Sequence, residues 1–311
     1  MKLIDLHCDT PAALYRQRAS LAQNALHVDL EKTAPFSAYV QAAAYFTPPD
    51  VPDADGMALV HAYHAYLQKA VSADPRAVLI DRAAGLQAAV KSGKRGFLPA
   101  VEDLRILNGD LDDLSVLWHT GVRIVTPVWR DRSCIGGAWN TDAGLLPFGK
   151  SAVETALSLG MIPDVSHASP AAFDDIAALC RAAGKPFVAT HSCAFSLCPH
   201  RRNLTDGQIK AVAASGGLIG VNLYPVFLTG REHADLDDIV RHIRHMQAMA
   251  GADAVAVGSD FDGVGCLPQD IACVRDLPRL YDHLAACGFS GDTLEKLFFE
   301  NAYRFLIENL P

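Results

Sequence analysis

MKLIDLHCDT (residues 1–10) contains the pattern on which the whole chain is built. The apolar run at residues 3–6 has the length and composition of a buried strand, and two ligand-type side chains, His7 and Asp9, follow at its end. Residues two apart on a strand point to the same side, so His7 and Asp9 face together while Cys8 faces away. We therefore expect a buried strand whose carboxyl end carries chemically active groups.

The same unit, a short apolar run followed by a turn and helical spacing, recurs along all 311 residues. Eight apolar runs predict strands, at residues 3–6, 39–46, 97–101, 122–128, 161–165, 187–189, 217–223 and 254–257. Helical periodicity is clearest at residues 58–71, 83–90, 151–159, 170–182, 206–214, 236–249 and 276–286. Strands that alternate with helices imply a parallel sheet with crossover helices.

Eight such units predict an α/β fold of the (β/α)8 TIM-like barrel type, with an open doubly wound sheet as the alternative. The chain contains no Pro/Ser-rich linker, no low-complexity tract and no repeat of fixed period. We therefore expect a single domain over residues 1–311. Residues 19–33 fit the alternation poorly and are expected to form a small excursion, either a hairpin or a cap. Residues 291–310 are expected to form covering helices at the carboxyl end.

Composition narrows the class of partner. Half of the residues are hydrophobic and 20% are charged, which is typical of a folded globular protein. The chain has 27 Lys plus Arg against 35 Asp plus Glu, a formal charge of −8. An acidic surface disfavours nonspecific binding to nucleic acid or to an anionic membrane. A small molecule is the expected partner.

The sequence also indicates the cellular compartment of the protein. The first residues lack the pattern of a signal peptide, and no apolar stretch reaches the ~18 residues of a membrane span. The eight cysteines form no CxxC pair and are expected to be reduced thiols. These features predict a cytoplasmic protein that does not contact membranes.

Six side chains able to bind a metal follow the predicted strands: His7, Asp9, Glu102, His167, His191 and Asp260. Each has an ordinary alternative, such as a histidine-carboxylate hydrogen bond, a solvated acidic turn, a satisfied core position or an Asx turn. In a (β/α)8 barrel, however, the carboxyl ends of the strands form the active-site face. Their common position therefore predicts one site.

The donor types indicate which metal chemistry this site would support. Imidazole and carboxylate without thiolate suit Zn²⁺, with Mn²⁺ or Co²⁺ able to substitute. Two cations ~3.5–4 Å apart need a bridging anion, which Glu102 can supply, while three imidazoles and Asp9 fill the other positions. A water shared by the two cations becomes a hydroxide near neutral pH. Asp260 could then carry its proton to a leaving group.

Seven segments carry a family resemblance: LHCDT (6–10), VED (101–103), GMIPDVSH (160–167), HS (191–192), RNLTD (202–206), GGLIGVN (216–222) and GSDFDG (258–263). In this order they resemble the renal (membrane) dipeptidase family of the amidohydrolase superfamily, over nearly the whole chain. The resemblance implies a (β/α)8 barrel with two zinc ions. By it, His7 and Asp9 would ligate one zinc, His167 and His191 the other, and Glu102 would bridge them.

The same resemblance implies roles in substrate binding and proton transfer. Asp260 would take the proton of the bridging hydroxide and pass it to the departing amine, and it would contact the substrate. Arg202 would bind the terminal carboxylate of the substrate, although it could instead pair with surface acids. Tyr224 would line the pocket. The implied enzyme is a binuclear zinc dipeptidase, usually a homodimer, that hydrolyses dipeptides including those with a C-terminal D-residue.

Trp129 departs from the pattern of the family. Mammalian members carry a histidine at this position that contacts the scissile carbonyl. Loss of such a donor costs ~10²–10³ in rate unless Arg130, Arg132 or the metals replace it. We expect Trp129 to form a wall of the substrate pocket.

The departure leaves an alternative reaction open: a related metal-dependent amidase or lactonase acting on N-acyl amino acids or cyclic substrates. A metal-free binding protein is a third possibility, which the complete ligand set disfavours.

GLLPFGKS (residues 144–151) matches the phosphate-binding pattern GxxxxGK[ST]. That loop works directly after a buried strand, whereas residues 133–143 are polar and glycine-rich. Pro147 also removes one backbone donor from the loop. We therefore expect a loop that leads into a helix, and no nucleotide site.

Overall fold

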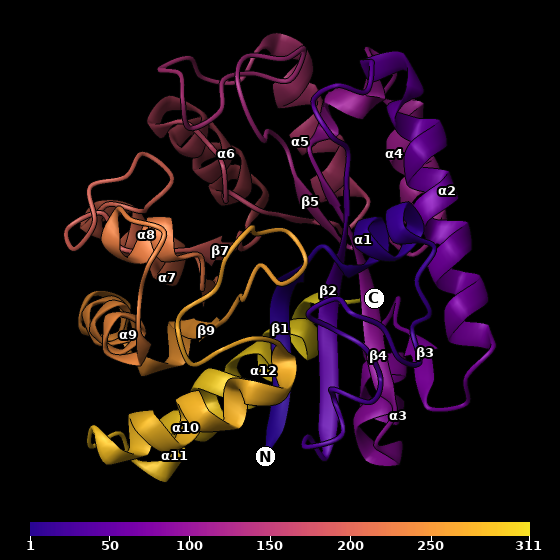
Figure 1. Cartoon of the computed structure of the whole chain (residues 1–311). Coiled ribbons are helices and arrows are strands. Elements are labelled where there is room, and N and C mark those ends of the chain that lie inside the picture. Colours follow the sequence, from indigo (N-terminus) through magenta and orange to yellow (C-terminus); the bar gives the residue numbers. More distant parts are fainter.

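The barrel predicted from the sequence is present in the computed structural model, which describes residues 1–311 (Figure 1). Its eight strands are β1 (Lys2–Cys8), β2 (Ala38–Phe46), β4 (Arg95–Glu102), β5 (Ile124–Thr126), β6 (Ile162–Pro163), β7 (Ala189–Ser192), β8 (Ile219–Val221) and β9 (Val255–Val257). They pair in parallel in the order β6-β5-β4-β2-β1-β9-β8-β7.

Hydrogen bonds between the ends of this order close the sheet. The amide of Val188 donates to the carbonyl of Pro163 at 2.9 Å, and the amide of Val165 donates to the carbonyl of Val188 at 2.8 Å. These bonds join the segments of β6 and β7. The fold is therefore a closed barrel, and the open doubly wound alternative is wrong.

Helices follow the strands and cover the barrel. They are α1 (Thr10–Gln17), α2 (Asp53–Ser72), α3 (Ala83–Ser92), α4 (Asp112–His119), α5 (Pro147–Ser158), α6 (Pro170–Ala183), α7 (Asp206–Ala214), α8 (Pro225–Thr229), α9 (Leu236–Ala250), α10 (Leu277–Ala286), α11 (Gly291–Glu295) and α12 (Asn301–Asn309). Local sequence sets several ends: Ser169 caps α6 through the amide of Ala172, Thr205 forms a capping box at α7, and Gly184 ends α6 in the left-handed region.

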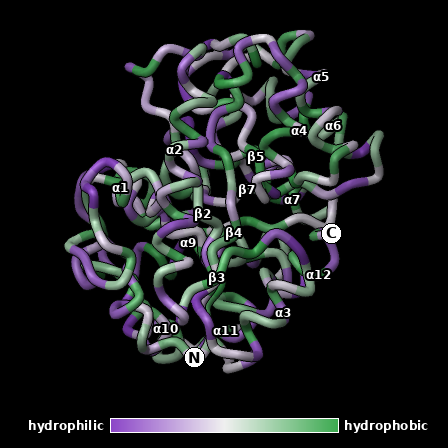
Figure 2. Tube along the Cα trace, turned by 90° about the vertical axis from the view of Figure 1, so that its right-hand side faces the viewer, coloured by the Kyte–Doolittle hydropathy of each residue, from purple (hydrophilic) through white to green (hydrophobic).

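Two hydrophobic clusters hold these layers together. The larger, of 69 buried residues, includes side chains of the surrounding helices packed on the strands. The smaller, of 20, has members on or next to all eight barrel strands and therefore fills the barrel interior. Phe299, Phe305 and Leu306 belong to it and bring the last helices against the barrel, where Figure 1 shows α12 beside the start of β1. Figure 2 shows hydrophobic stretches on central strands such as β4 and hydrophilic stretches in peripheral loops.

The elements differ from the sequence predictions in three places. A ninth strand, β3 (Ala77–Leu79), pairs with the first residues of β4 outside the barrel order. Helices α1, α4 and α8 were not predicted. Residues 19–33 contain turns and bends but no strand, and the segment is held by contacts such as the ion pair between Lys32 and Asp29 at 2.7 Å.

The loop that imitates a phosphate-binding motif is used for internal contacts. Helix α5 begins at Pro147, inside the motif, and the amide of Leu145 and the ammonium of Lys150 both bind Asp175 at 2.8 Å. A Cβ on Gly149 would lie 1.9 Å from the carbonyl oxygen of Ile135, so close helix packing explains this glycine. Its amide and lysine are thus engaged by a carboxylate of the chain itself.

No helix of this chain combines the length and the apolarity needed to cross a bilayer.

Candidate metal centre

The six side chains predicted to form one site lie together at the carboxyl ends of the barrel strands. They are His7 in β1, Asp9 just before α1, Glu102 at the end of β4, His167 after β6, His191 in β7 and Asp260 after β9. Strand register aligns these ends, since Glu102 pairs with Phe46 of β2 and with Thr126 of β5. All six are at most 9% exposed.

Glu102 lies between two groups of donor atoms. Its Oε2 is 3.5 Å from Nε2 of His7, which is also 3.4 Å from Oδ2 of Asp9. Its Oε1 is 2.8 Å from Nε2 of His167 and 3.5 Å from Nε2 of His191. Each group has its donors within 4.8 Å of one another, so each could hold one cation. One carboxylate oxygen therefore faces each half of the site.

Hydrogen bonds direct the lone pairs of two histidines into the site. Nδ1 of His167 donates to the carbonyl of Trp129 at 3.0 Å, and Nδ1 of His191 donates to the hydroxyl of Thr190 at 2.9 Å. When the rings are neutral, both Nε2 atoms carry lone pairs, and these atoms are only 2.9 Å apart. Two lone pairs at this distance repel unless a positive species lies against them. The arrangement fits a metal ion.

Two further buried atoms lack a hydrogen-bond partner. Nε2 of His7 and Oδ1 of Asp9 make no hydrogen bond, although buried polar atoms nearly always do. Both residues belong to the donor group on the Oε2 side of Glu102. The second half of the site therefore also fits a cation.

The charges in the site are unbalanced. Burial, reinforced by neighbouring positive groups, holds the pKa values of His167 and His191 well below the ordinary range, so both rings are neutral at pH 7. Burial opposes the charge of His7, but the carboxylates of Glu102 and Asp9 outweigh it and hold its pKa well above the usual value. Burial also raises the pKa of Glu102. Buried carboxylates this close together need a positive charge beside them, which a cation would supply.

The backbone is strained at two positions of the site. His167 has φ 77° and Asp260 has φ 64°, a left-handed conformation that costs about 1–3 kcal/mol for residues other than glycine. Asp260 is held by the amide of Asn222, which donates to its Oδ2 at 2.9 Å, and by its own amide, which donates to the carbonyl of His7 at 3.1 Å. An Asp260 oxygen lies within 4.8 Å of the ligand nitrogens of His7 and His191.

A cavity of about 270 Å³ opens above these residues, and Asp9, Glu102, His167 and Asp260 are part of its lining. Trp129 forms one wall with Phe46, their ring centroids 4.7 Å apart. Tyr224 and Phe227 form another wall, with centroids 5.0 Å apart. The two aromatic pairs form walls of the cavity over the donor atoms.

Three arginines considered from the sequence lie in different surroundings. Arg130 and Arg132 are exposed and do not line the cavity. Arg202 is 4% exposed, donates from Nη2 to the carbonyl of His191 at 3.1 Å, and lies 5.2 Å from the ring centre of Phe227. Its Nε has no hydrogen-bond partner, and its neighbour Arg201, not Arg202, pairs with the surface acid Asp142. Arg202 does not line the cavity directly.

Several lining residues were missed by sequence reasoning. Phe46 ends a predicted strand and could have been found by the rule that located Glu102. Arg16 lies in the last turn of α1, and Phe227 lies in α8, two helices that the periodicity did not reveal. Gly263, Val264 and Gly265 complete the rim.

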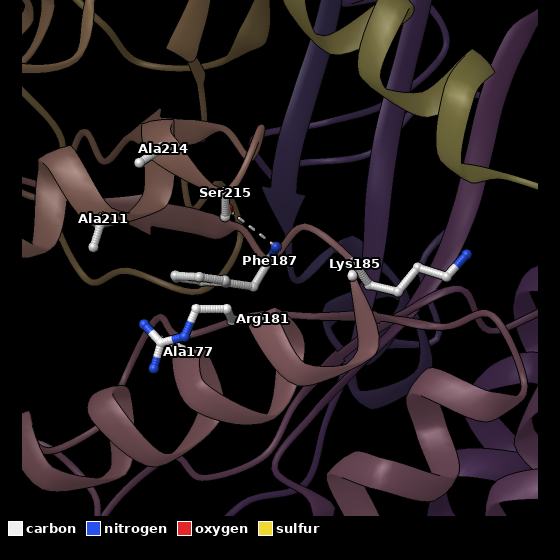
Figure 3. A pocket seen from close by; sticks show the side chains of 8 residues that line it. Ala177, Arg181, Lys185, Phe187, Ala211, Ala214 and Ser215 are labelled. Carbon is white, nitrogen blue, oxygen red and sulfur yellow. Dashed lines mark hydrogen bonds between the residues drawn. The ribbon is translucent and has the colours of Figure 1, made fainter.

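A larger hollow, of about 470 Å³, lies between α6 and α7 on the outside of the barrel (Figure 3). The ring of Phe187 forms its floor, Arg181 lies along one side, and the ammonium of Lys185 points away. It contains no cluster of metal-binding or nucleophilic side chains. Size alone therefore does not identify the functional site.

Comparison with known proteins agrees with this geometry. Residues 1–309 match the model of the membrane dipeptidase family, peptidase family M19. An uncharacterized protein in the pqqA 5′ region of Klebsiella pneumoniae is 40% identical over 211 residues, 64% of this chain and 76% of that protein.

Two solved structures are similar over the full length. A metallopeptidase of family M19, dipeptidase AC, superposes with a TM-score of 0.92 at 28% identity and covers 100% of this chain and 99% of its own. A metallopeptidase from Rhodobacter sphaeroides bound to a phosphinate mimic of L-Ala-D-Ala gives 0.91 at 28% identity, with the same coverage.

Proposed function

Because this chain belongs to the membrane dipeptidase family, a family of metallopeptidases, we propose that it is a binuclear zinc dipeptidase. The observation that carries the proposal is the position of Glu102, with one carboxylate oxygen directed to each of two groups of buried donors. A bridging carboxylate of this kind is what a two-metal hydrolase requires.

Five side chains would hold the metals. His7 and Asp9 would bind one, His167 and His191 the other, and Glu102 both. Nitrogen and oxygen donors without a thiolate favour Zn²⁺, with Mn²⁺ or Co²⁺ as substitutes. Divalent cations supply Lewis acidity, which polarises a carbonyl and makes water a stronger acid near neutral pH.

Asp260 would move the proton. Its Oδ2 is occupied by the amide of Asn222, while the other oxygen is free to face the cavity. This carboxylate would accept a proton from the attacking water and donate it to the amine nitrogen as the peptide bond breaks. Burial raises the pKa of Asp260, which brings it closer to the range useful for proton transfer at neutral pH.

Arg202 would recognise the free carboxylate of the substrate. Its planar guanidinium suits two-point contact with a carboxylate, and its Nε has no hydrogen-bond partner. Arg202 does not line the cavity itself but lies against the ring of Phe227, which does. Trp129 and Tyr224 would line the two sides of the substrate. The Rhodobacter protein bound to a mimic of L-Ala-D-Ala supports dipeptides, including those with a C-terminal D-residue, as the substrate class.

The test is a steady-state screen on zinc-loaded protein. L-Ala-L-Ala and L-Ala-D-Ala should be hydrolysed, whereas N-acetyl-L-alanine and a tripeptide should be poor substrates. Chelation should abolish turnover, and added zinc should restore it. Zinc-loaded protein that cleaves none of the dipeptides would contradict the proposal.

One observation favours a second function, a related amidase or lactonase. Trp129 stands where mammalian relatives carry the carbonyl-binding histidine, and neither Arg130 nor Arg132 lines the cavity. A substrate with a more reactive carbonyl would depend less on such a donor. Faster turnover of N-acyl amino acids or lactones than of any dipeptide in the same screen would favour this alternative.

We also propose that the enzyme is a homodimer, as the resemblance implies. Light scattering of the purified chain should give twice the mass of 33.3 kDa.

A further inference from the structure

One buried hydroxyl, that of Thr190, contacts imidazoles from both halves of the candidate metal centre. Thr190 lies in β7 and is 1% exposed. Its Oγ1 is 2.9 Å from Nδ1 of His191 and 3.4 Å from Nδ1 of His7. These two histidines belong to the two different donor groups that share Glu102. A single oxygen atom thus lies behind both groups.

Asp164 determines the direction in which this hydroxyl donates. Four donors converge on its carboxylate: the amides of Ser166 and Thr190, each at 2.9 Å, the hydroxyl of Thr126 at 2.8 Å and the hydroxyl of Thr190 at 2.6 Å. An ionised carboxylate can only accept hydrogen bonds, so the proton of Thr190 is directed to Asp164. The lone pairs of Oγ1 remain for the imidazoles and for the hydroxyl of Ser166, which lies 3.3 Å away.

The consequence is a fixed tautomer. Because the one proton of the Thr190 hydroxyl is given to Asp164, Nδ1 of His191 must carry the hydrogen of the 2.9 Å contact, which leaves the lone pair on Nε2, the atom 3.5 Å from Glu102. The longer contact to His7 places Thr190 to accept the Nδ1 hydrogen of that ring, so that Nε2, 3.5 Å from Glu102, is the nitrogen that would give up its proton to a metal. A ring without such a partner would present an N–H to the metal for part of the time.

We propose that Thr190, oriented by Asp164, is a positioning residue that fixes the tautomers of His191 and His7 and so prepares both halves of the metal centre together. The inference rests on the proposed metal ligation by these two histidines. It assigns a role to a pair of residues that touches neither substrate nor metal.

The chain offers matched variants for the test. Thr190→Val keeps the shape of the side chain but removes the hydroxyl, and Thr190→Ser restores it. Thr126→Val is the control, because Thr126 donates to the same oxygen of Asp164 yet contacts none of the histidines. A general loosening of the Asp164 network would affect Thr126→Val as much as Thr190→Val.

Two readouts test the proposal. Competition with a chelating dye should show zinc binding to Thr190→Val weakened by about 10–100-fold, the usual effect of losing the partner of a ligating histidine. Thr190→Ser and Thr126→Val should bind zinc nearly as the unaltered protein does. In metal-free protein, imidazole ¹⁵N–¹H correlation spectra should show His191 as the Nδ1–H tautomer, and this single form should be lost in Thr190→Val alone.

Equal zinc affinity and equal imidazole spectra in Thr190→Val and the unaltered protein would overturn the proposal, as would an equal loss in Thr126→Val. Failure of the proposed function gives a different result. If the unaltered protein binds zinc but cleaves no dipeptide, the proposed dipeptidase activity is refuted while the role of Thr190 still stands. If the unaltered protein binds no zinc, the proposed metal centre is refuted. The imidazole spectra of Thr190→Val then decide whether Thr190 fixes the tautomer of His191.

Discussion

Replacement of Asp260 by Asn separates proton transfer from metal binding. The change removes a basic oxygen but keeps the size of the side chain, and Asn tolerates the left-handed backbone found at this position, φ 64°. The amide oxygen of Asn can still accept the hydrogen bond that Asn222 donates at 2.9 Å. We therefore expect a change in the free energy of unfolding of about 1 kcal/mol or less.

The expected effect on turnover is much larger. A positioned general acid or base contributes about 10²–10⁴ in rate, equivalent to about 2.7–5.4 kcal/mol of transition-state stabilisation. Asp260→Asn should lose this factor in kcat for L-Ala-D-Ala. Metal analysis should still find two zinc ions per chain, because the proposed ligands are His7, Asp9, Glu102, His167 and His191.

Asp262→Asn is the matched control for this loop. The carboxylate of Asp262 accepts from the hydroxyl of Thr10 at 2.7 Å and from the amide of His27 at 2.6 Å, and it does not line the cavity. This variant should lose stability in urea while keeping most of its turnover. An Asp260→Asn enzyme with two metals and a kcat within tenfold of the unaltered value would refute the assigned proton transfer. Loss of a metal from that variant would refute it as well, by making Asp260 a ligand.

Three further predictions concern stability and substrate contact. Burial lowers the pKa of His242, whose two ring nitrogens are hydrogen-bonded to backbone groups. Below the ordinary histidine pKa of about 6.5, the unfolded chain therefore binds a proton at His242 while the folded chain does not. The free energy of unfolding consequently falls as the pH drops below this value, by up to ~1.4 kcal/mol per pH unit. His242→Gln should make urea unfolding less steeply dependent on pH between about 6.5 and 5, and an unchanged slope would count against this reasoning. A Cβ on Gly220 would lie 1.9 Å from the carbonyl oxygen of Thr190, so Gly220→Ala should lower the free energy of unfolding by about 1–3 kcal/mol. Gly291→Ala is the control: its added Cβ would meet no atom within 4 Å, and the free energy of unfolding should stay nearly unchanged. Trp129→Ala removes a pocket wall and should raise KM by about tenfold with a smaller change in kcat; a fall in kcat alone would show that the indole acts on the transition state.

The barrel could be predicted because its strands are buried on both faces and read as continuous apolar runs. The exact extent of the strands could not, since pairing in a closed barrel depends on both neighbours. Residues 161–165 look like one strand, yet β6 covers only Ile162–Pro163, and Asp164 pairs with Val188 as an isolated bridge. Strand β3 consists of three residues and has no periodicity to reveal it.

The candidate ligands could be predicted from their common position after strands. Helix α1 was missed because Asp9 and the first residues of the helix directly follow β1, with no intervening loop to separate the two patterns. As a result Arg16 was not expected at the cavity. The hydrogen bond between Thr190 and Asp164 could not be predicted for a different reason. The two residues lie 26 positions apart, and only closure of the barrel brings β6 and β7 together.

Anomalous diffraction from zinc-loaded crystals tests whether two metals share the carboxylate of Glu102. At the zinc edge we expect two peaks per chain, one on each side of Glu102 and about 3.5–4 Å apart. One peak should lie beside His7 and Asp9, the other beside His167 and His191. A single peak, or peaks away from these side chains, would contradict the account.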